Sequence, residues 1–159
     1  MTQKHSVYEF LIAGALAAGA SFAPAFAMGP TDAELKQESA TYQSAVADIK
    51  AKNYQAGIDK LMGIYNGTGG DADTLNELGY AHRMLGQYDD SLRFYKEALQ
   101  LDPDHREAHE YLGELYLQTN KPDDARAELA TLTKLCGKCE EQEDLAEAIE
   151  HWKPAKTGN

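Results

Sequence analysis

The residues with the clearest chemical potential are the only two cysteines of the chain, which form the motif Cys136-Gly137-Lys138-Cys139. Two thiols at this spacing can form a disulfide, exchange electrons as a redox pair, or supply two ligands to a metal ion. We interpret them as a structural disulfide that clips the turn before the last helix, because redox CxxC motifs follow a strand and the sequence predicts no strand here. A redox-active or metal-binding pair remains the alternative. Covalent haem is excluded, because Glu140 rather than a histidine follows the second cysteine.

Two histidines four residues apart, His105 and His109, form a second candidate, because this spacing can put both imidazoles on one helix face. The nearby Glu110 is not at the position that a zinc-protease motif requires, so we expect packed or partly exposed histidines instead. A structural zinc site would need four ligands, and no second pair at the usual spacing accompanies the CxxC motif. The sequence therefore predicts no cofactor.

Asp71 and Asp73 follow a glycine-rich stretch and could suggest a calcium loop. The downstream glycine and the final glutamate of such a loop are missing, so we expect these side chains to cap a helix. The sequence also contains no nucleophile elbow, phosphate-binding loop or pair of catalytic carboxylates at a defined spacing. We therefore predict that the protein is not an enzyme.

The elements that must position these residues repeat with a period of 34 residues. Small residues, which allow close packing, recur in two columns: Ala45, Gly79 and Gly113, and then Gly57, Ser91 and Ala125. Larger residues recur in three columns: Tyr54, Tyr88 and Pro122 in the turn between helices, Leu61, Tyr95 and Leu129 in the second helix, and Ile64, Ala98 and Leu132 one turn later. Each repeat thus contains two amphipathic helices, and several repeats must stack to bury a continuous core.

The middle repeat, residues 72–105, resembles the tetratricopeptide-repeat (TPR) consensus closely. The matching residues are Leu78-Gly79, Ala81, Gly86, Tyr88, Ala98 and the closing Leu101-Asp102-Pro103. The resemblance implies an all-α, right-handed superhelical solenoid of three helix-turn-helix units, at residues 38–71, 72–105 and 106–139. The first unit is the weakest match, and it ends in a flexible glycine-rich link at residues 66–70.

A C-terminal capping helix is expected at residues 140–152. Its apolar residues, Leu145, Ala148, Ile149 and Trp152, follow helical spacing. The acidic residues of its first turn favour the positive end of the helix dipole by about 0.3–1 kcal/mol each, so we interpret them as helix-end electrostatics rather than as a metal site.

In the TPR family, the first helix of each unit lines a concave groove. By register, the residues that point into the groove of this chain are Tyr42, Val46, Ile49, Lys50, Asn76, Tyr80, Arg83, Met84, Glu110, Glu114, Leu117 and Gln118. Family members that grip a C-terminal carboxylate use positive charge where this chain has Glu110 and Glu114. We therefore expect an extended peptide or helix with apolar anchors and some basic residues. In the alternative, Arg83 simply pairs with Glu110 or Glu114.

The resemblance implies a non-enzymatic protein–protein interaction module, a periplasmic adaptor or assembly factor that binds a protein or peptide segment in the groove. Exposed grooves and solenoid ends also allow a homodimer. The alternative function is that of a redox or metal-handling accessory protein that uses Cys136 and Cys139. The net charge of -11 repels phosphate backbones, so nucleic acid is not expected as a partner.

The first 27 residues have the pattern of a signal peptide. A small-residue-rich apolar stretch runs from Phe10 to Phe22, and the triplet Ala25-Phe26-Ala27 suits signal peptidase. We therefore expect export to a bacterial periplasm, no stable membrane insertion after cleavage, and a TPR domain at residues 28–152. The tail at residues 153–159 is expected to be disordered.

Overall fold

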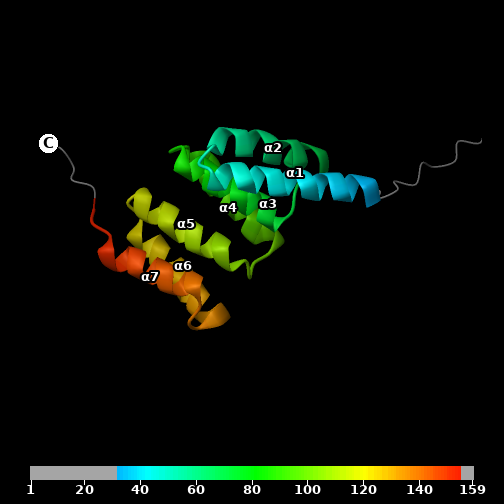
Figure 1. Ribbon diagram of the computed structural model, residues 1–159. Coiled ribbons are helices and arrows are strands. Elements are labelled where there is room, and N and C mark those ends of the chain that lie inside the picture. The colour runs from blue at the N-terminus through cyan, green and yellow to red at the C-terminus, as the bar shows by residue number, and fades with distance from the viewer. Residues whose placement is uncertain (1–31, 155–159) are drawn as a thin grey trace, which may run out of the picture.

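The computed structural model describes residues 32–154, and it contains seven α-helices and no strand in that range. The helices are α1 (Asp32–Lys50), α2 (Tyr54–Thr68), α3 (Ala72–Met84), α4 (Tyr88–Leu101), α5 (Arg106–Gln118), α6 (Pro122–Cys136) and α7 (Glu140–His151). Three helical hairpins stack in chain order, and α7 packs against α5 and α6 (Figure 1). The predicted all-α solenoid of helix-turn-helix units is therefore confirmed.

Two predicted segments fall wholly or partly outside this range. The signal peptide, at residues 1–27, is outside it, and so are residues 155–159 of the expected tail. Among the helices that the structure describes, none combines the length and the apolar character needed to cross a bilayer.

The same turn joins the two helices of every hairpin. Lys52, Gly86 and Asn120, which are 34 residues apart, adopt a left-handed backbone with φ of 64°, 73° and 60°. The next residue in each turn donates its backbone N–H to a carbonyl five residues earlier: Asn53 to Asp48, Gln87 to His82, and Lys121 to Tyr116. These hydrogen bonds satisfy carbonyls that the end of the first helix would otherwise leave unpaired.

The second helix of each hairpin begins earlier than the sequence predicts. Tyr54, Tyr88 and Pro122, which we expected in the turn, are instead the first residues of α2, α4 and α6. The reason is that one left-handed residue is enough to reverse the chain. Proline suits such a first helical position, because the missing N–H would have no partner there.

The link between the first two hairpins is shorter than the glycine-rich stretch at residues 66–70 suggests. Helix α2 continues as far as Thr68, whose hydroxyl donates to the carbonyl of Ile64 at 3.3 Å. Gly69 then ends the helix with φ of 88°, and its N–H donates to the carbonyl of Tyr65. The prediction of a flexible link at residues 66–70 is therefore wrong for residues 66–68, which belong to α2. The helix extends that far because Gly69, in the left-handed conformation, caps its end.

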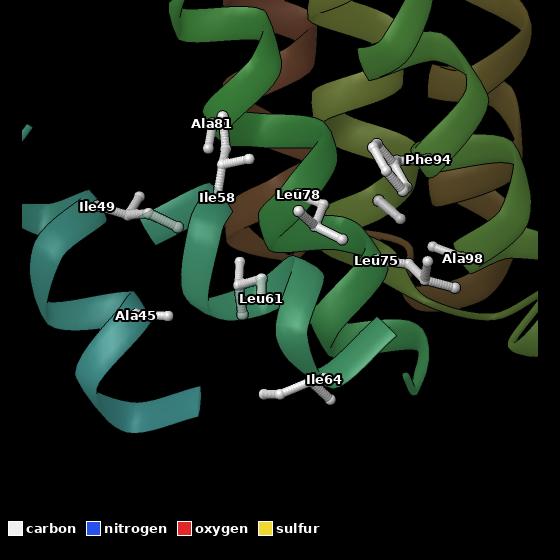
Figure 2. Packing of buried hydrophobic residues seen from close by; sticks show 11 residues of the cluster. Ala45, Ile49, Ile58, Leu61, Ile64, Leu75, Leu78, Ala81, Phe94 and Ala98 are labelled. Carbon is white, nitrogen blue, oxygen red and sulfur yellow. The ribbon is translucent and has the colours of Figure 1, made fainter. Parts of the chain in front are cut away.

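The hydrophobic core runs continuously through the stacked hairpins. In Figure 2, side chains of α1, α2, α3 and α4 turn toward one another between the helices; they are Ala45, Ile49, Ile58, Leu61, Ile64, Leu75, Leu78, Ala81, Phe94 and Ala98. A second cluster, Tyr95, Leu112 and Leu115, joins α4 to α5. The core thus crosses every boundary between neighbouring hairpins, which is how a solenoid obtains its stability.

Glycines of the small-residue columns let helices approach closely. A Cβ atom at Gly79 would lie 2.6 Å from the ring of the fully buried Tyr95. A Cβ atom at Gly113 would lie 2.5 Å from Leu145, so this glycine forms the notch into which α7 docks. Gly57, in the other small-residue column, would likewise place a Cβ atom 2.5 Å from Ile49. The 34-residue recurrence of small residues therefore reflects three tight contacts, two within hairpins and one with the capping helix.

We expect Gly79→Ala to lower the free energy of unfolding by about 1–3 kcal/mol, because overpacking would displace the buried Tyr95 ring. The matched control is Gly63→Ala, since Gly63 lies within α2 with open space where its Cβ would be. That control should instead raise stability by up to about 1 kcal/mol through helix propensity. Urea unfolding of both variants measures the difference. Equal effects of the two substitutions would contradict the close contact.

Candidate functional site

Two hollows lie among the predicted groove residues. The first, which we call the α1–α3 hollow, has a volume of about 200 Å³ and is lined by Val46, Ile49, Lys50, Lys52, Tyr54, Glu77, Tyr80 and Tyr111. The second, the α7 hollow, has a volume of about 430 Å³ and is lined by Arg83, Glu114, Leu117, Gln118, Asn120, Ala148, Trp152 and Lys153. Eight of the twelve residues placed by register therefore line one hollow or the other.

The four remaining residues are placed differently. Tyr42 lies toward the opposite end of the face, in a recess with Asp71 and Asp73. Asn76 and Glu110 are buried and line neither hollow, while Met84 is exposed at the end of α3. The structure thus brings most of the predicted groove together, and it places Tyr42 and Met84 at its margins.

Arg83 is the central cation of the groove. Its side chain is buried, and its Nη2 lies 2.6 Å from a carboxylate oxygen of Glu114. The guanidinium also lies 5.3 Å from the ring centroid of Tyr80 and 5.6 Å from that of Tyr111, within the range of cation–π attraction. Burial alone would lower the pKa of Arg83, but Tyr95 and Glu114 outweigh burial and raise it. Of the two pairings that the sequence allows, the structure therefore selects the one with Glu114.

Glu110 is a buried carboxylate that faces other acids. Its residue is only 8% exposed, and its side chain makes no hydrogen bond or ion pair with the residues that the structure describes. Burial, together with the nearby carboxylates of Glu114 and Asp144, raises the pKa of Glu110 to about 8. Arg83 is thus occupied by the neighbouring glutamate, and Glu110 has no cation of its own in this part of the chain.

Glu77 and Glu107 form a second pair of interacting acids on the same face as Glu110. Burial and the carboxylate of Glu107 raise the pKa of Glu77 to about 7, although Lys50 acts in the opposite direction. Asn76 is 1% exposed, and its Nδ2 donates a hydrogen bond of 3.4 Å to Glu107. We call Asn76, Glu77, Glu107 and Glu110 the acidic centre, because Glu107 influences both of the other carboxyl groups.

Tyrosine rings form a row along the groove. The ring centroids of Tyr54 and Tyr80 are 6.4 Å apart, and those of Tyr80 and Tyr111 are 5.1 Å apart. Burial and the nearby carboxylates Glu110 and Glu107 raise the pKa of Tyr111. The phenol of Tyr111 therefore stays protonated, and the row presents ring faces and hydroxyl groups along the groove.

Sequence reasoning missed four residues of the site: Glu77, Tyr111, Glu107 and Trp152. Glu77 and Tyr111 occupy one column of the 34-residue period, directly after Asn76 and Glu110, so the register contained a signal for them. Trp152 was assigned only to the apolar face of the cap. Its Nε1 donates to the carbonyl of Leu117 at 2.9 Å, which fixes the ring against the α7 hollow.

The other groups with chemical potential have structural contacts. His105 caps α5 by accepting from the N–H of Ala108, and its other ring nitrogen faces Asp73. His109 binds Glu128 at 2.6 Å through one ring nitrogen and the carbonyl of Pro103 through the other. The two histidines therefore contact different elements rather than a shared point. Within residues 32–154, no group of three or more histidine, cysteine, aspartate or glutamate side chains could hold a metal ion.

The cysteines and the aspartate cap lie at helix boundaries. Cys136 ends α6 and Cys139 directly precedes α7, and the structure joins their sulfur atoms. Asp71 caps α3 as expected, since its carboxylate accepts a hydrogen bond of 2.8 Å from the N–H of Thr74.

Comparison with known proteins agrees with this architecture. Residues 82–149 match a family model described as tetratricopeptide repeat. No curated protein sequence matches the chain. The TPR domain of Arabidopsis OM64 superimposes with a TM-score of 0.67 at 12% identity, over 73% of this chain and 96% of that one. The model match and the shared fold together support the TPR family for the repeated helices.

Two further solved structures share the fold. The second TPR domain of human RPAP3, in complex with an HSP70 peptide, has a TM-score of 0.66 and 16% identity, over 73% of this chain and 97% of that one. The Yersinia enterocolitica type III secretion translocator chaperone SycD has a TM-score of 0.66 and 18% identity, over 77% of this chain and 98% of that one. At these identities the likeness establishes the fold alone.

We expect Glu110→Gln to stabilise the protein increasingly as the pH rises. The pKa of Glu110 is about 8 in the folded protein and near the ordinary 4.5 in the unfolded chain, so folding opposes its ionisation. The wild type therefore loses stability across that pH interval, and the variant does not. The difference in unfolding free energy should grow from near zero below about pH 4.5 to about 1–3 kcal/mol above about pH 8.

Chemical unfolding of both proteins across this pH range measures that difference. Glu147→Gln is the control, because Glu147 is an exposed carboxylate on α7 and its neutralisation should leave the pH profile nearly unchanged. A flat difference between Glu110→Gln and the wild type would show that Glu110 ionises freely.

Proposed function

We propose that this chain is a non-enzymatic interaction module that binds a segment of a partner protein in the groove formed by α1, α3, α5 and α7. The observation that carries this proposal is the pair of hollows on this face, together with the tyrosine row and the acidic centre. Asn76 Oδ1 and Arg83 Nε are buried there without a hydrogen-bond partner among the described residues. A surface of ring faces and buried polar groups suits recognition of a peptide segment.

Structures of similar fold support this choice of ligand. The RPAP3 domain is in complex with an HSP70 peptide, and the protein PcrH, with a TM-score of 0.64 and 18% identity, is in complex with the chaperone binding region of PopB. We infer that the present chain likewise takes a protein segment. A terminal carboxylate is not the expected anchor, because Arg83 is already paired with Glu114 and the remaining groups at the centre are acidic.

We further propose that the module acts after export, as a periplasmic adaptor or assembly factor. The support is the sequence pattern of residues 1–27, together with a CxxC pair suited to an oxidising compartment.

Tyr80→Ala should abolish partner binding, because Tyr80 lines the α1–α3 hollow and contacts the guanidinium of Arg83. The mature protein would be used to recover partners from the periplasmic extract of its own cells, and the recovered proteins quantified by mass spectrometry. We expect at least a tenfold loss of a reproducible partner. The matched control is Tyr88→Ala, since Tyr88 is a partly exposed tyrosine at the start of α4.

The result would be interpreted only at temperatures where circular dichroism shows both variants to be folded. The proposal fails if every recovered partner binds Tyr80→Ala as well as it binds Tyr88→Ala.

A redox accessory role is the second candidate. The observation in its favour is that Cys139 directly precedes α7, where the helix N-terminus would stabilise a thiolate. On our proposal, changing both Cys136 and Cys139 to serine leaves partner recovery unchanged and lowers stability by about 2 kcal/mol or less, because the closed loop is short. Loss of partner recovery in the folded double variant, or trapping of mixed disulfides through Cys139, would favour the redox role instead.

A further inference from the structure

His109 lies at the junction between the second and third hairpins. It belongs to α5, its side chain is only 10% exposed, and its ring contacts two other elements. Nδ1 lies 2.6 Å from a carboxylate oxygen of Glu128 on α6. Nε2 lies 3.0 Å from the backbone carbonyl oxygen of Pro103, in the segment at residues 102–105 that we call the α4–α5 link. The imidazole therefore connects this link to α6.

These two contacts fix the number of protons that the ring and the carboxyl group hold together. A backbone carbonyl oxygen can only accept a hydrogen bond, so Nε2 must carry a hydrogen. The bond between Nδ1 and Glu128 needs a second hydrogen, and it lies on Nδ1 because histidine is the more basic of the two groups. Both ring nitrogens of His109 thus donate, as they do only in the charged imidazolium form.

The charged groups around the ring favour the same form. Burial alone would lower the pKa of His109, but the hydrogen bonds to Glu128 and Pro103 and the negative charges of Glu128 and Asp104 outweigh burial and raise it. Glu128 acts from α6 and Asp104 acts from the α4–α5 link. Tyr116, two turns further along α5, also lies near Glu128, and burial together with that carboxylate raises the pKa of its phenol, so it stays neutral.

Loss of the extra proton would break one of the two contacts. The remaining hydrogen stays on Nδ1, because a hydrogen bond to a carboxylate is stronger than one to a neutral carbonyl. Nε2 then presents a lone pair to the oxygen of Pro103, and two acceptors repel each other. The α4–α5 link leads directly into α5, which supplies Tyr111 to one hollow and Glu114 and Leu117 to the other. The order of this link therefore bears on the position of a wall of the groove.

We propose that His109, Glu128 and Pro103 form a pH-sensitive latch, which fastens the α4–α5 link to α6 while the imidazole is charged and releases it when the imidazole becomes neutral. The latch goes beyond the proposed function and does not depend on it.

The direction of the pH dependence follows from the folded and unfolded states. The pKa of His109 is higher in the folded protein than in the unfolded chain, where it is about 6.5. The latch therefore contributes its full stability below about pH 6.5, and this contribution is lost as the pH rises through the raised pKa.

The test is an NMR titration of the purified protein with ¹⁵N-labelled histidine, which reports the protonation of each imidazole nitrogen. Both nitrogens of His109 should be protonated at neutral pH. The midpoint of its titration should lie at least about one pH unit above that of His151, an exposed histidine on α7. The Glu110→Gln protein is used throughout, because Glu110 also titrates in this range.

Hydrogen exchange in the same protein measures release of the link. The backbone N–H of His105 donates to the carbonyl of Asp102 within the α4–α5 link, so its protection factor reports the order of that segment. We expect this protection to fall at least about tenfold as the pH rises, with the same midpoint as the imidazole of His109.

Two further substitutions locate the effect. Glu128→Gln removes the negative charge and keeps an acceptor, so it should move the midpoints of His109 and of the link to lower pH by about one unit or more. His151→Gln is the control, because His151 is exposed beside Glu147, and it should leave both midpoints unchanged.

Three outcomes would overturn the latch. The first is a single proton on the ring of His109 at neutral pH, or a midpoint no higher than that of His151. The second is constant protection of the link while His109 titrates. The third is a link midpoint that stays in place when Glu128→Gln shifts that of His109. The first two need no change at Glu128, so they decide the question even if Glu128→Gln does not fold.

Discussion

The close approach of helices at glycine is the constraint on which the rest of the structure depends. Gly79 admits the Tyr95 ring against its backbone, and Gly113 admits Leu145 in the same way. Gly79 packs against the second helix of its own hairpin and Gly113 packs against the capping helix, so both α3 and α5 are held close to a neighbouring helix, and the first helices line up along one face. The groove therefore results from the close packing of α3 and α5 against the helices on their other side. The groove face and the core share some residues, since Ile49 belongs to the core and Tyr80 packs against it, while both line the α1–α3 hollow.

On the groove face carboxylates face other carboxylates, whereas elsewhere on the surface acidic side chains pair with basic ones. On α4, Arg93 pairs with Asp90 and Glu97 in the usual local pattern. On the groove face, Glu110 is buried and Glu77 is partly buried beside further acids, an arrangement that opposes folding when they ionise. Natural proteins commonly keep such unfavourable groups where function needs them. The cost is tolerable here because the core crosses every hairpin boundary and is built mainly from apolar side chains away from these carboxylates.

Much of this organisation could be predicted from the 34-residue period, and the exceptions have physical reasons. The helices, the capping helix and most groove positions follow from small and apolar residues in register, since those residues pack the same way in every repeat. The choice of Glu114 over Glu110 as the partner of Arg83 could not be predicted, because it depends on distances between side chains of two helices. The left-handed turn at Lys52 could not be predicted either, because lysine, unlike Gly86 or Asn120, has no preference for a positive φ.

Helix α7 has a consequence for how copies of the chain can associate. Glu141 and Asp144 lie 34 residues after Glu107 and Glu110, so α7 takes the place that the first helix of a fourth repeat would occupy. Its outer face presents exposed carboxylates such as Glu143 and Glu150, and Trp152 ties its end to α5. The described end of the solenoid at α7 thus presents charge where a stacked repeat would need an apolar face, and this disfavours head-to-tail stacking of copies through α7.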